Sequence, residues 1–290
     1  MRGYGRKIMA ERILIVGLGL IGGSIAKALS AVALEKSVEY EIIGMDIDES
    51  VTQQALSCGA IDKIGETSDI ELADIIYICT YPKAAVDFVE KHGEKFKNGC
   101  IVTDVCGIKE TLCHDMWKLQ DRYNFFFVGS HPMAGKEESG FSASDSSLFK
   151  GSSYIIIDEN AQEAAIEKIS KLALKMQFGA IVRTTAKQHD KIIAFTSQLP
   201  HVLACAYVMN LQSRNHKGFS AGSYRDVSRV AKINGILWSR LFMQNKENLI
   251  EELDELTENI NKIKSSIQDG DEAKLADLLN SAAKIKEEIG

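Results

Sequence analysis

The residues best suited to chemistry lie in the segment 129–140, which reads GSHPMAGKEESG. His131 stands directly before Pro132, one of only three prolines in the chain. An imidazole titrates near neutral pH, and a proline stiffens the backbone beside it. Because the apolar run 125–128 is typical of a buried strand, we expect His131 at the mouth of a strand, where an α/β protein can hold a general base. A surface loop that happens to contain a histidine is the alternative.

A second group of polar residues follows in the C-terminal half. Asp190, Ser197 and His201 are spaced i, i+7 and i+11. At about 3.6 residues per turn, this spacing predicts one face of a helix. An acid, a hydroxyl and an imidazole among apolar neighbours can line a binding pocket, and a solvated helix face is the alternative.

Two arginines form a third candidate site. Arg225 and Arg229 are four residues apart and share a face of an expected helix. Neighbouring guanidinium groups repel each other unless an anion lies close to both. Arginine binds carboxylates through two parallel hydrogen bonds. The pair therefore indicates an anionic ligand. Pairing with Asp226 or with surface glutamates is the alternative.

A glycine-rich turn near the N-terminus indicates a dinucleotide. The sequence GLGLIG at 17–22 follows an expected strand at 12–16 and precedes an alanine-rich helix. In this context Gly17 permits a tight turn, Gly19 lets the backbone approach a pyrophosphate, and Gly22 lets the helix pack closely on the strand. The helix N-terminus then offers its N–H groups to the anion.

The residue after the second expected strand favours NAD over NADP. Asp46 can accept hydrogen bonds from both ribose hydroxyls and would repel a 2′-phosphate, and the residues after it add acid but no arginine. The turns after the third and fourth strands should face the same edge. The residues expected at the cofactor are Gly17, Gly19, Leu20, Ile21, Gly22, Asp46, Thr80, Pro82 and Gly107.

Strands and helices alternate through the first part of the chain, which predicts parallel strands with right-handed crossovers. From residue 186 onward, apolar residues recur every three or four positions and no strand is expected. The fold class is therefore α/β, with a doubly wound Rossmann domain at 1–185 followed by an all-helical dimerisation domain at 186–290. The expected strands are 12–16, 40–45, 75–79, 100–103, 125–128, 151–157 and 181–184.

An apolar stripe runs along one long helix of the second domain. Its members step by four, three, four, three and four residues, so they share a face. We interpret the stripe as a subunit interface of a homodimer, and packing against the chain's own helices is the alternative. The stripe consists of Leu249, Leu253, Leu256, Ile260, Ile263 and Ile267.

The bulk composition excludes several classes of protein. The chain has 290 residues, a net charge of −6 and no basic block, which argues against nucleic acid as a partner. It shows no signal peptide and no apolar run of membrane length. Six scattered cysteines without a CxxC motif indicate reduced thiols in the cytoplasm. Cys106, Cys113 and His114 have no metal-ligand spacing, so no metal is expected.

Taken together, these segments resemble the prephenate/arogenate dehydrogenase family of tyrosine biosynthesis. The matching segments are Asp46 and residues 17–26, 104–109, 129–140, 189–201 and 222–231. The resemblance implies a Rossmann domain joined to a helical dimerisation domain. It also implies oxidative decarboxylation of prephenate to 4-hydroxyphenylpyruvate, with hydride passed to NAD.

The resemblance also implies roles for individual residues. His131 would be the base that takes the proton from the ring hydroxyl, Arg229 would bind the ring carboxylate, and Glu137 would gate Arg229. Two departures from the family are Gly107, where serine is frequent, and Lys136, where threonine is common. The residues implied to bind the substrate or order its pocket are Arg229, Arg225, His201, Ser197, Glu137, Asp190, Gly222 and Trp238.

Three other functions stay open. Arogenate as the substrate would differ from prephenate by an amino group in place of the side-chain keto group. A β-hydroxyacid dehydrogenase would need a lysine in the helical domain, for which no matching segment exists. A non-catalytic NAD-binding regulator is suggested only by Gly107. The main hypothesis requires His131 and Arg229, from the two halves of the chain, to converge on one small acid.

Overall fold

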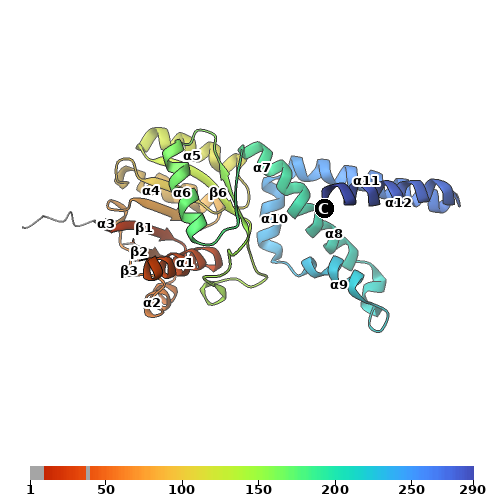
Figure 1. Cartoon of the computed structure of the whole chain (residues 1–290), viewed down its shortest axis with the longest axis horizontal. Coiled ribbons are helices and arrows are strands. Elements are labelled where there is room, and N and C mark those ends of the chain that lie inside the picture. The colour runs from red at the N-terminus through yellow and green to blue at the C-terminus, as the bar shows by residue number, and fades with distance from the viewer. Residues whose placement is uncertain (1–9, 37–39) are drawn as a thin grey trace, which may run out of the picture. The chain divides into compact units, whose positions relative to one another are not determined.

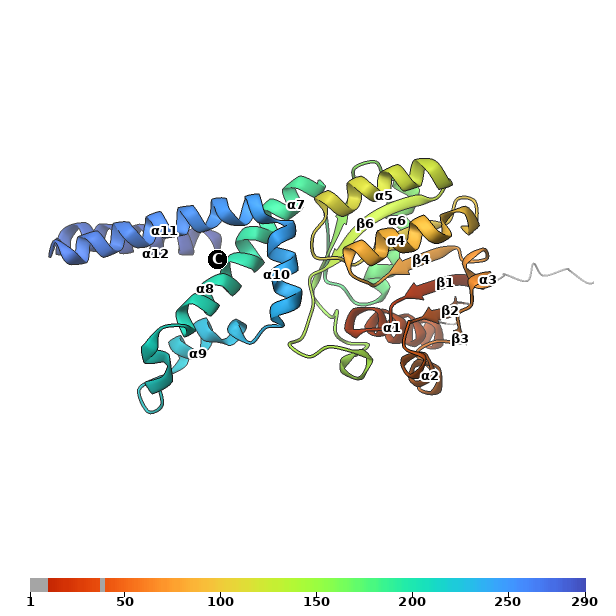
Figure 2. The same ribbon diagram turned by 180° about the vertical axis from the view of Figure 1, so that it is seen from behind.

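A computed structural model describes residues 10–36 and 40–290 of the chain. The described residues fall into two compact units, one ending at Asp190 and the other beginning at Lys191. The first is a sheet covered by helices, and the second consists of helices (Figures 1 and 2). The domain boundary predicted between residues 185 and 186 stays a prediction, because a domain is a part that folds by itself. None of the described helices has the length and apolar character needed to cross a membrane.

The N-terminal unit is built on one sheet. Its first strand carries a continuous apolar run, Ile13 to Val16, that is buried on both faces, as a central parallel strand requires. In the described part of the chain the strand order is β3-β2-β1-β4-β5-β6-β7-β8. The strands are β1 (Glu11–Val16), β2 (Tyr40–Met45), β3 (Lys63–Ile64), β4 (Ile75–Ile78), β5 (Ile101–Asp104), β6 (Phe126–Pro132), β7 (Ser153–Ile157) and β8 (Ala180–Thr184).

The register brings the turns of the candidate site to one edge of the sheet. Val16 pairs with Met45 on one side and with Ile78 on the other, and Ile78 pairs with Asp104. The carboxyl ends of β1, β2, β4 and β5 therefore lie level. Since ligands of doubly wound folds bind at this edge, where the strand order reverses between β1 and β4, the turn at Gly17 lies where a nucleotide should bind.

Helices cover both faces of the sheet. Ile25 and Leu29 of α1 and Ile169 of α6 pack into one hydrophobic core, and Val89 of α4 and Met116 of α5 pack into the other. This two-sided cover confirms the predicted Rossmann-like class. The helices are α1 (Leu20–Lys36), α2 (Glu49–Ser57), α3 (Thr67–Ile70), α4 (Pro82–His92), α5 (Glu110–Tyr123), α6 (Glu163–Lys175) and α7 (Ala186–Ile193).

One strand pair departs from the expected parallel order. β6 and β7 run antiparallel, with His131 opposite Ile155. The chain between them holds only a short 3₁₀ turn at Phe141–Ala143 and no crossover helix, and a parallel connection needs such a crossover. The sequence analysis also missed β3, α2 and α3, which are short. α2 begins where the side chain of Asp48 accepts a hydrogen bond from the N–H of Ser50.

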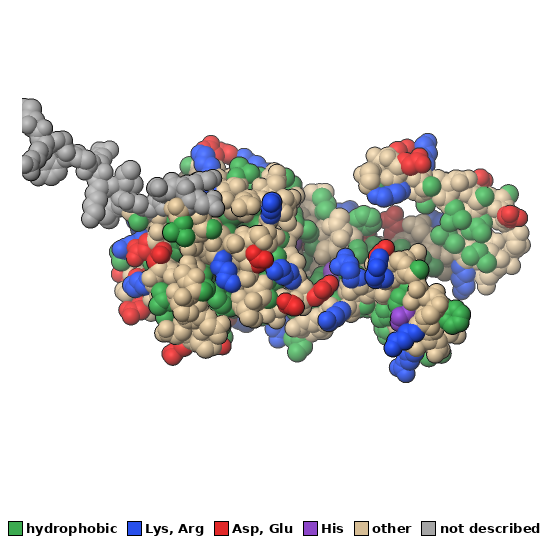
Figure 3. All heavy atoms as spheres, turned by 60° about the horizontal axis from the view of Figure 1, so that its bottom comes forward, with side chains coloured by type: hydrophobic (Ala, Val, Ile, Leu, Met, Phe, Trp, Pro, Cys, Tyr) green, Lys and Arg blue, Asp and Glu red, His purple; other side chains and the backbone are tan. Residues whose placement is uncertain are grey.

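The described residues from Lys191 onward form no strand, as expected. The predicted stripe lies on α11. Leu249 is 5% exposed, while Ile260 and Ile267 are 48% and 61% exposed. Hydrophobic side chains are visible on the surface of this unit (Figure 3). Its helices are α8 (Leu199–Val208), α9 (Gly222–Ser228), α10 (Gly235–Gln244), α11 (Lys246–Gln268) and α12 (Glu272–Ile289).

A π-helical turn, Ala194–Gln198, separates α7 from α8. The prediction that Asp190, Ser197 and His201 share one face assumed about 3.6 residues per turn throughout. A π-turn holds more residues per turn and changes the phase of the helix. The assumed α-helical geometry is therefore wrong over this stretch, although π-turns are frequent at functional sites.

The glycine turn gives a test of the packing. A Cβ on Gly22 would stand 1.9 Å from the carbonyl oxygen of Gly17, while a Cβ on Gly19 would meet nothing within 4 Å. We expect Gly22→Ala to lower the free energy of unfolding by at least about 2 kcal/mol, because the backbone must move. The matched control Gly19→Ala should change it by less than about 0.5 kcal/mol. Urea unfolding measures both, and equal stabilities would contradict this packing.

Candidate functional site

The glycine turn after β1 leaves its backbone open to a ligand. Gly17 has φ of +91° and its N–H donates to the carbonyl of Met45 at 2.7 Å, so the turn is held against β2. Gly22 packs too closely on Gly17 for any side chain. Gly19 faces open space immediately before α1 begins at Leu20. An anion can therefore approach the backbone at the N-terminus of a helix. Ile21 instead packs against the hydrophobic core.

Asp46 and Thr80 border the same turn. The carboxylate of Asp46 accepts hydrogen bonds from the N–H of Leu18 at 2.7 Å and of Asp48 at 3.0 Å, which fixes it beside the glycines. The hydroxyl of Thr80 is buried without a hydrogen-bond partner among the described residues. A buried hydroxyl without a partner is costly, and a ligand at this edge would satisfy it. Pro82 begins α4 behind it.

His131 lies in β6, and the structure brings it next to Gly107. A Cβ on Gly107 would stand 3.7 Å from Nε2 of His131. Nδ1 of His131 lies 2.9 Å from Nε2 of His189. Burial lowers the pKa of His131 well below its ordinary value of 6.5, and the neighbouring His189 and Lys109 lower it further. The imidazole is therefore neutral at pH 7, which is the form that accepts a proton.

A buried ion pair lies beneath His131. Lys109 and Asp104 have fully buried side chains in direct contact. The ammonium of Lys109 also donates to the carbonyl oxygen of Ser130 at 2.6 Å. Ser130 in turn donates its N–H to Asp104 at 3.1 Å, and its hydroxyl lies 2.6 Å from that of Tyr154. This network fixes the backbone that carries the histidine.

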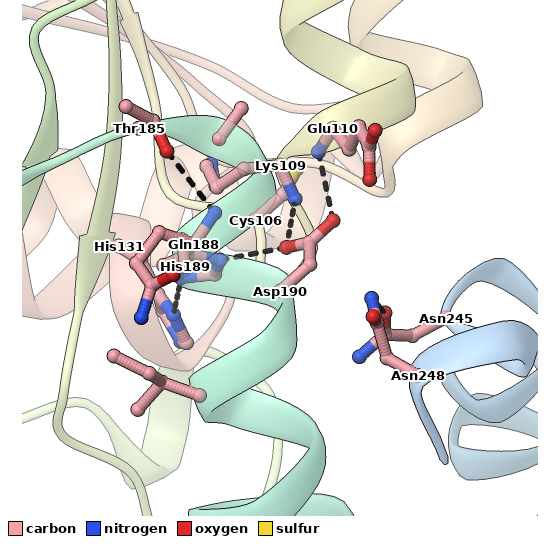
Figure 4. Close-up of polar contacts among 12 residues, drawn as sticks. Cys106, Lys109, Glu110, His131, Thr185, Gln188, His189, Asp190, Asn245 and Asn248 are labelled. Atoms are coloured by element: carbon pink, nitrogen blue, oxygen red, sulfur yellow. Dashed lines mark hydrogen bonds and ion pairs between the residues drawn. The ribbon is translucent and has the colours of Figure 1, made fainter. Parts of the chain in front are cut away.

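Asp190 joins α7 to α5. Its two carboxylate oxygens accept hydrogen bonds from the N–H groups of Lys109 and Glu110, both at 2.8 Å, at the N-terminus of α5 (Figure 4). One of them also lies 2.7 Å from Nδ1 of His189. The sequence analysis selected Asp190 but missed His189, for which the His-Asp pair at 189–190 was the available signal.

The loop after His131 carries Lys136 and Glu137, both exposed. Lys136 lies 3.6 Å from the carboxylate of Asp145 on its own loop and donates to the carbonyl of Ala143 at 3.4 Å. The positive charge of Lys136 is thus partly neutralised by groups of its own loop. The gating role expected for Glu137 stays a prediction.

Two of the expected pocket residues meet within the helical unit. The rings of His201 and Trp238 stack with centroids 3.7 Å apart. Nδ1 of His201 lies 2.7 Å from the carbonyl oxygen of Ser197, one turn earlier. That carbonyl only accepts, so Nδ1 of His201 carries a proton and Nε2 is the nitrogen available to a ligand. The sequence spacing alone did not indicate the contact with Trp238.

The arginines belong to one short segment. Gly222 begins α9, and Arg229 begins the 3₁₀ turn that follows it. Arg225 lies 3.4 Å from the carboxylate of Asp226, and both side chains are exposed, so this ion pair adds little stability. His131 and Arg229 lie in different units, and their convergence stays a prediction.

A Rossmann-like sheet with an open glycine turn, followed by a helical unit, is typical of nucleotide-binding dehydrogenases. Residues 29–182 match the family model for the prephenate dehydrogenase nucleotide-binding domain, and residues 185–281 match that for the prephenate dehydrogenase dimerization domain. The chain belongs to the prephenate dehydrogenase family.

Individual relatives agree with this assignment. A prephenate dehydrogenase of Bacillus subtilis is 30% identical over 273 residues, covering 91% of this chain and 72% of the relative. A cyclohexadienyl dehydrogenase of Zymomonas mobilis is 30% identical and covers 90% of each chain. The crystal structure of prephenate dehydrogenase from A. aeolicus with hydroxyphenyl propionate and NAD+ shares the fold, with a TM-score of 0.83 at 24% identity, covering 98% of this chain and 100% of that one.

The buried ion pair generates a prediction. Lys109→Met leaves the Asp104 carboxylate buried without its cation, so we expect a loss of about 3–5 kcal/mol of unfolding free energy. Adding Asp104→Asn should recover at least about 1 kcal/mol, because a neutral amide costs less to bury. The control Lys171→Met removes an exposed pair with Glu167 and should cost less than about 1 kcal/mol. A double-mutant cycle in urea measures the coupling, and no recovery would disprove it.

Proposed function

We propose that the chain catalyses the NAD-dependent oxidative decarboxylation of prephenate to 4-hydroxyphenylpyruvate, a step of tyrosine biosynthesis. The observation that carries the proposal is a neutral imidazole at the nucleotide edge of the sheet, with Nε2 of His131 beside the turn at Gly107. Membership of the family and the name of the Bacillus subtilis relative support it.

The residues at this edge fit NAD. The open backbone at Gly19 and the N-terminus of α1 suit the pyrophosphate, and Asp46 suits the adenosine ribose. The unsatisfied hydroxyl of Thr80 suits a polar atom of the same ligand. When bound, NAD supplies the hydride acceptor of the reaction.

His131 has the chemistry of the base. Its Nε2 accepts the proton of the ring hydroxyl as the carbon that bears it is oxidised. When CO₂ leaves, the two electrons of the broken bond between the ring and its carboxylate stay with the ring, which becomes aromatic. The oxygen regains a proton as the phenol forms. The ring and side-chain carboxylates are anions in a chain of net charge −6, so they need local cations. Arg229 and Arg225 are proposed for this role, with His201, Ser197 and Trp238 shaping the pocket.

Arogenate is the second candidate substrate. It carries the same cyclohexadienyl ring as prephenate, and the name of the Zymomonas mobilis relative refers to that ring. The base and the ring carboxylate contact would be unchanged. Contacts of the protein with the side chain of the substrate would distinguish the amino group of arogenate from the keto group of prephenate.

We also propose that the chain works as a homodimer through its helical unit. The family model for this part is described as a dimerization domain. The far half of the α11 stripe, which includes Ile260 and Ile267, is exposed in the single chain. A row of exposed apolar side chains on a long helix is buried most simply against a second copy.

The activity itself is the first test. Purified chain with prephenate and NAD should produce NADH, and parallel runs with arogenate and with NADP set the preferences. His131→Asn should lower kcat by roughly 10²–10⁴-fold, which is what a positioned base contributes, while NAD binding stays unchanged. Turnover of the variant at the wild-type rate would remove His131 as the base. An inactive wild-type protein that still binds NAD would favour the regulator.

The pH dependence follows from the lowered pKa of His131. A base works in its neutral form, so activity is lost as the pH falls through the pKa of the base. An unperturbed histidine would place this loss near pH 6.5, but burial and the neighbouring His189 and Lys109 move it lower. We expect kcat/KM to be flat from about pH 6.5 to 8 and to fall only below that range. A half-maximal point at or above pH 6.5 with prephenate would contradict this electrostatic account.

A further inference from the structure

Three groups of the N-terminal unit form an unbroken line of hydrogen bonds that ends at the proposed base. Asp190 Oδ1 lies 2.7 Å from His189 Nδ1, and His189 Nε2 lies 2.9 Å from His131 Nδ1 (Figure 4). His189 and Asp190 are each 2% exposed, so water does not compete for the contact between them, and the contact of His189 with His131 is partly buried. The line runs from a carboxylate through one imidazole to another.

The positions of the protons follow from the donors and acceptors. A carboxylate accepts and does not donate, and Asp190 already accepts from the N–H groups of Lys109 and Glu110. His189 Nδ1 must therefore carry a proton. In a neutral imidazole this leaves Nε2 of His189 as an acceptor, so the proton in the next contact belongs to Nδ1 of His131. The lone pair of neutral His131 then lies on Nε2.

We propose that His189, held by Asp190, is a positioning residue that keeps His131 in the tautomer with its lone pair on Nε2, the nitrogen next to Gly107. This inference rests on the proposed function, in which His131 is the base. His189 is buried, and both of its ring nitrogens are engaged by Asp190 and His131. It acts by choosing which nitrogen of His131 can accept a proton.

The charges around the pair agree with two neutral imidazoles. Burial lowers the pKa of His189, opposed by its hydrogen bond to Asp190, and Lys109 adds a repulsive charge. The pKa of His131 is lowered by the same burial and by His189 and Lys109. The nearby charges are thus the Lys109 ammonium and the carboxylates of Asp190 and Asp104. They favour at most one additional proton on the two neutral imidazoles, and in this arrangement that proton arrives at Nε2 of His131.

Proton transfer needs no rearrangement in this arrangement. When Nε2 of His131 accepts the proton, its Nδ1–H still donates to His189, and His189 still donates to Asp190. No proton leaves His189, and the negative charge of Asp190 stabilises the new imidazolium through the intervening ring. A simple core histidine at 189 would give none of these effects, because any apolar residue of similar size would replace it.

The tautomer can be read without turnover. In protein labelled with ¹⁵N-histidine, two-bond ¹⁵N–¹H NMR correlations at pH 7.5 should show His131 protonated on Nδ1, with the signal assigned by its loss in His131→Asn. His189→Leu fills the space but removes the acceptor, so the His131 signal should move toward the Nε2–H form. His189→Gln keeps a side-chain acceptor and should keep the wild-type pattern. Protonation of wild-type His131 on Nε2 would overturn the inference, whether or not any variant folds.

Kinetics give the second readout. His189→Leu should lower kcat by roughly 10²–10⁴-fold, up to the full contribution of a base, while His189→Gln loses clearly less. The KM for prephenate and the Kd for NAD should stay within about threefold of wild type, because only the transition state loses stabilisation. A variant with reduced Tm and raised KM but an unchanged His131 tautomer would mean a structural role and would also overturn the inference.

The two proposals fail separately. If His131→Asn keeps full turnover while the His131 tautomer still responds to position 189, the base assignment fails and the tautomer control stands. If the tautomer does not respond while His131→Asn is inactive, the base assignment stands and the role of His189 fails.

Discussion

A buried ammonium group at Lys109 fixes the part of the N-terminal unit on which the candidate site depends. It contacts the carboxylate of Asp104 at the end of β5 and the carbonyl of Ser130 in β6. Burial alone would lower the pKa of Lys109, but Asp104 beside it outweighs burial and raises the pKa above its ordinary value of 10.5. The pair therefore stays charged, and a charged pair in the interior tolerates little displacement. His131 follows Ser130 directly, so the base inherits this rigidity.

The same charge also affects the chemistry. A base must be neutral before it acts, and Lys109 opposes protonation of both His131 and His189. Asp190, on the far side of His189, has the opposite effect, because its negative charge stabilises a positive charge on the histidines. The opposing effects of Lys109 and Asp190 on the histidines come from these neighbouring groups and not from the charge of the whole chain, which is −6. Carboxylate substrates are proposed to meet arginines for the same reason.

The sequence predicted what depends on local pattern. The apolar runs of β1 and β2, the glycine turn and Asp46 all lie as expected, because strand burial and turn conformation depend on neighbouring residues. The antiparallel pairing of β6 with β7 escaped prediction, because it depends on the absence of a crossover helix. The contacts of Lys109 with Asp104 and of His131 with His189 escaped it too. Lys109 follows Asp104 by only five residues, but their contact depends on the turn between β5 and α5. The two histidines are 58 positions apart, and only the tertiary fold brings them together.

The glycine at position 107 explains why the support of His131 must come from the opposite side of its ring. A side-chain hydroxyl at 107 would begin from a Cβ 3.7 Å from Nε2, within reach of a hydrogen bond to the very nitrogen that accepts the proton. With glycine there, nothing from residue 107 orients that nitrogen. The contact of Nδ1 with His189 orients the ring from the other side, and it leaves Nε2 open to the hydroxyl of a substrate. Glycine at position 107 thus increases the importance of the contact with His189.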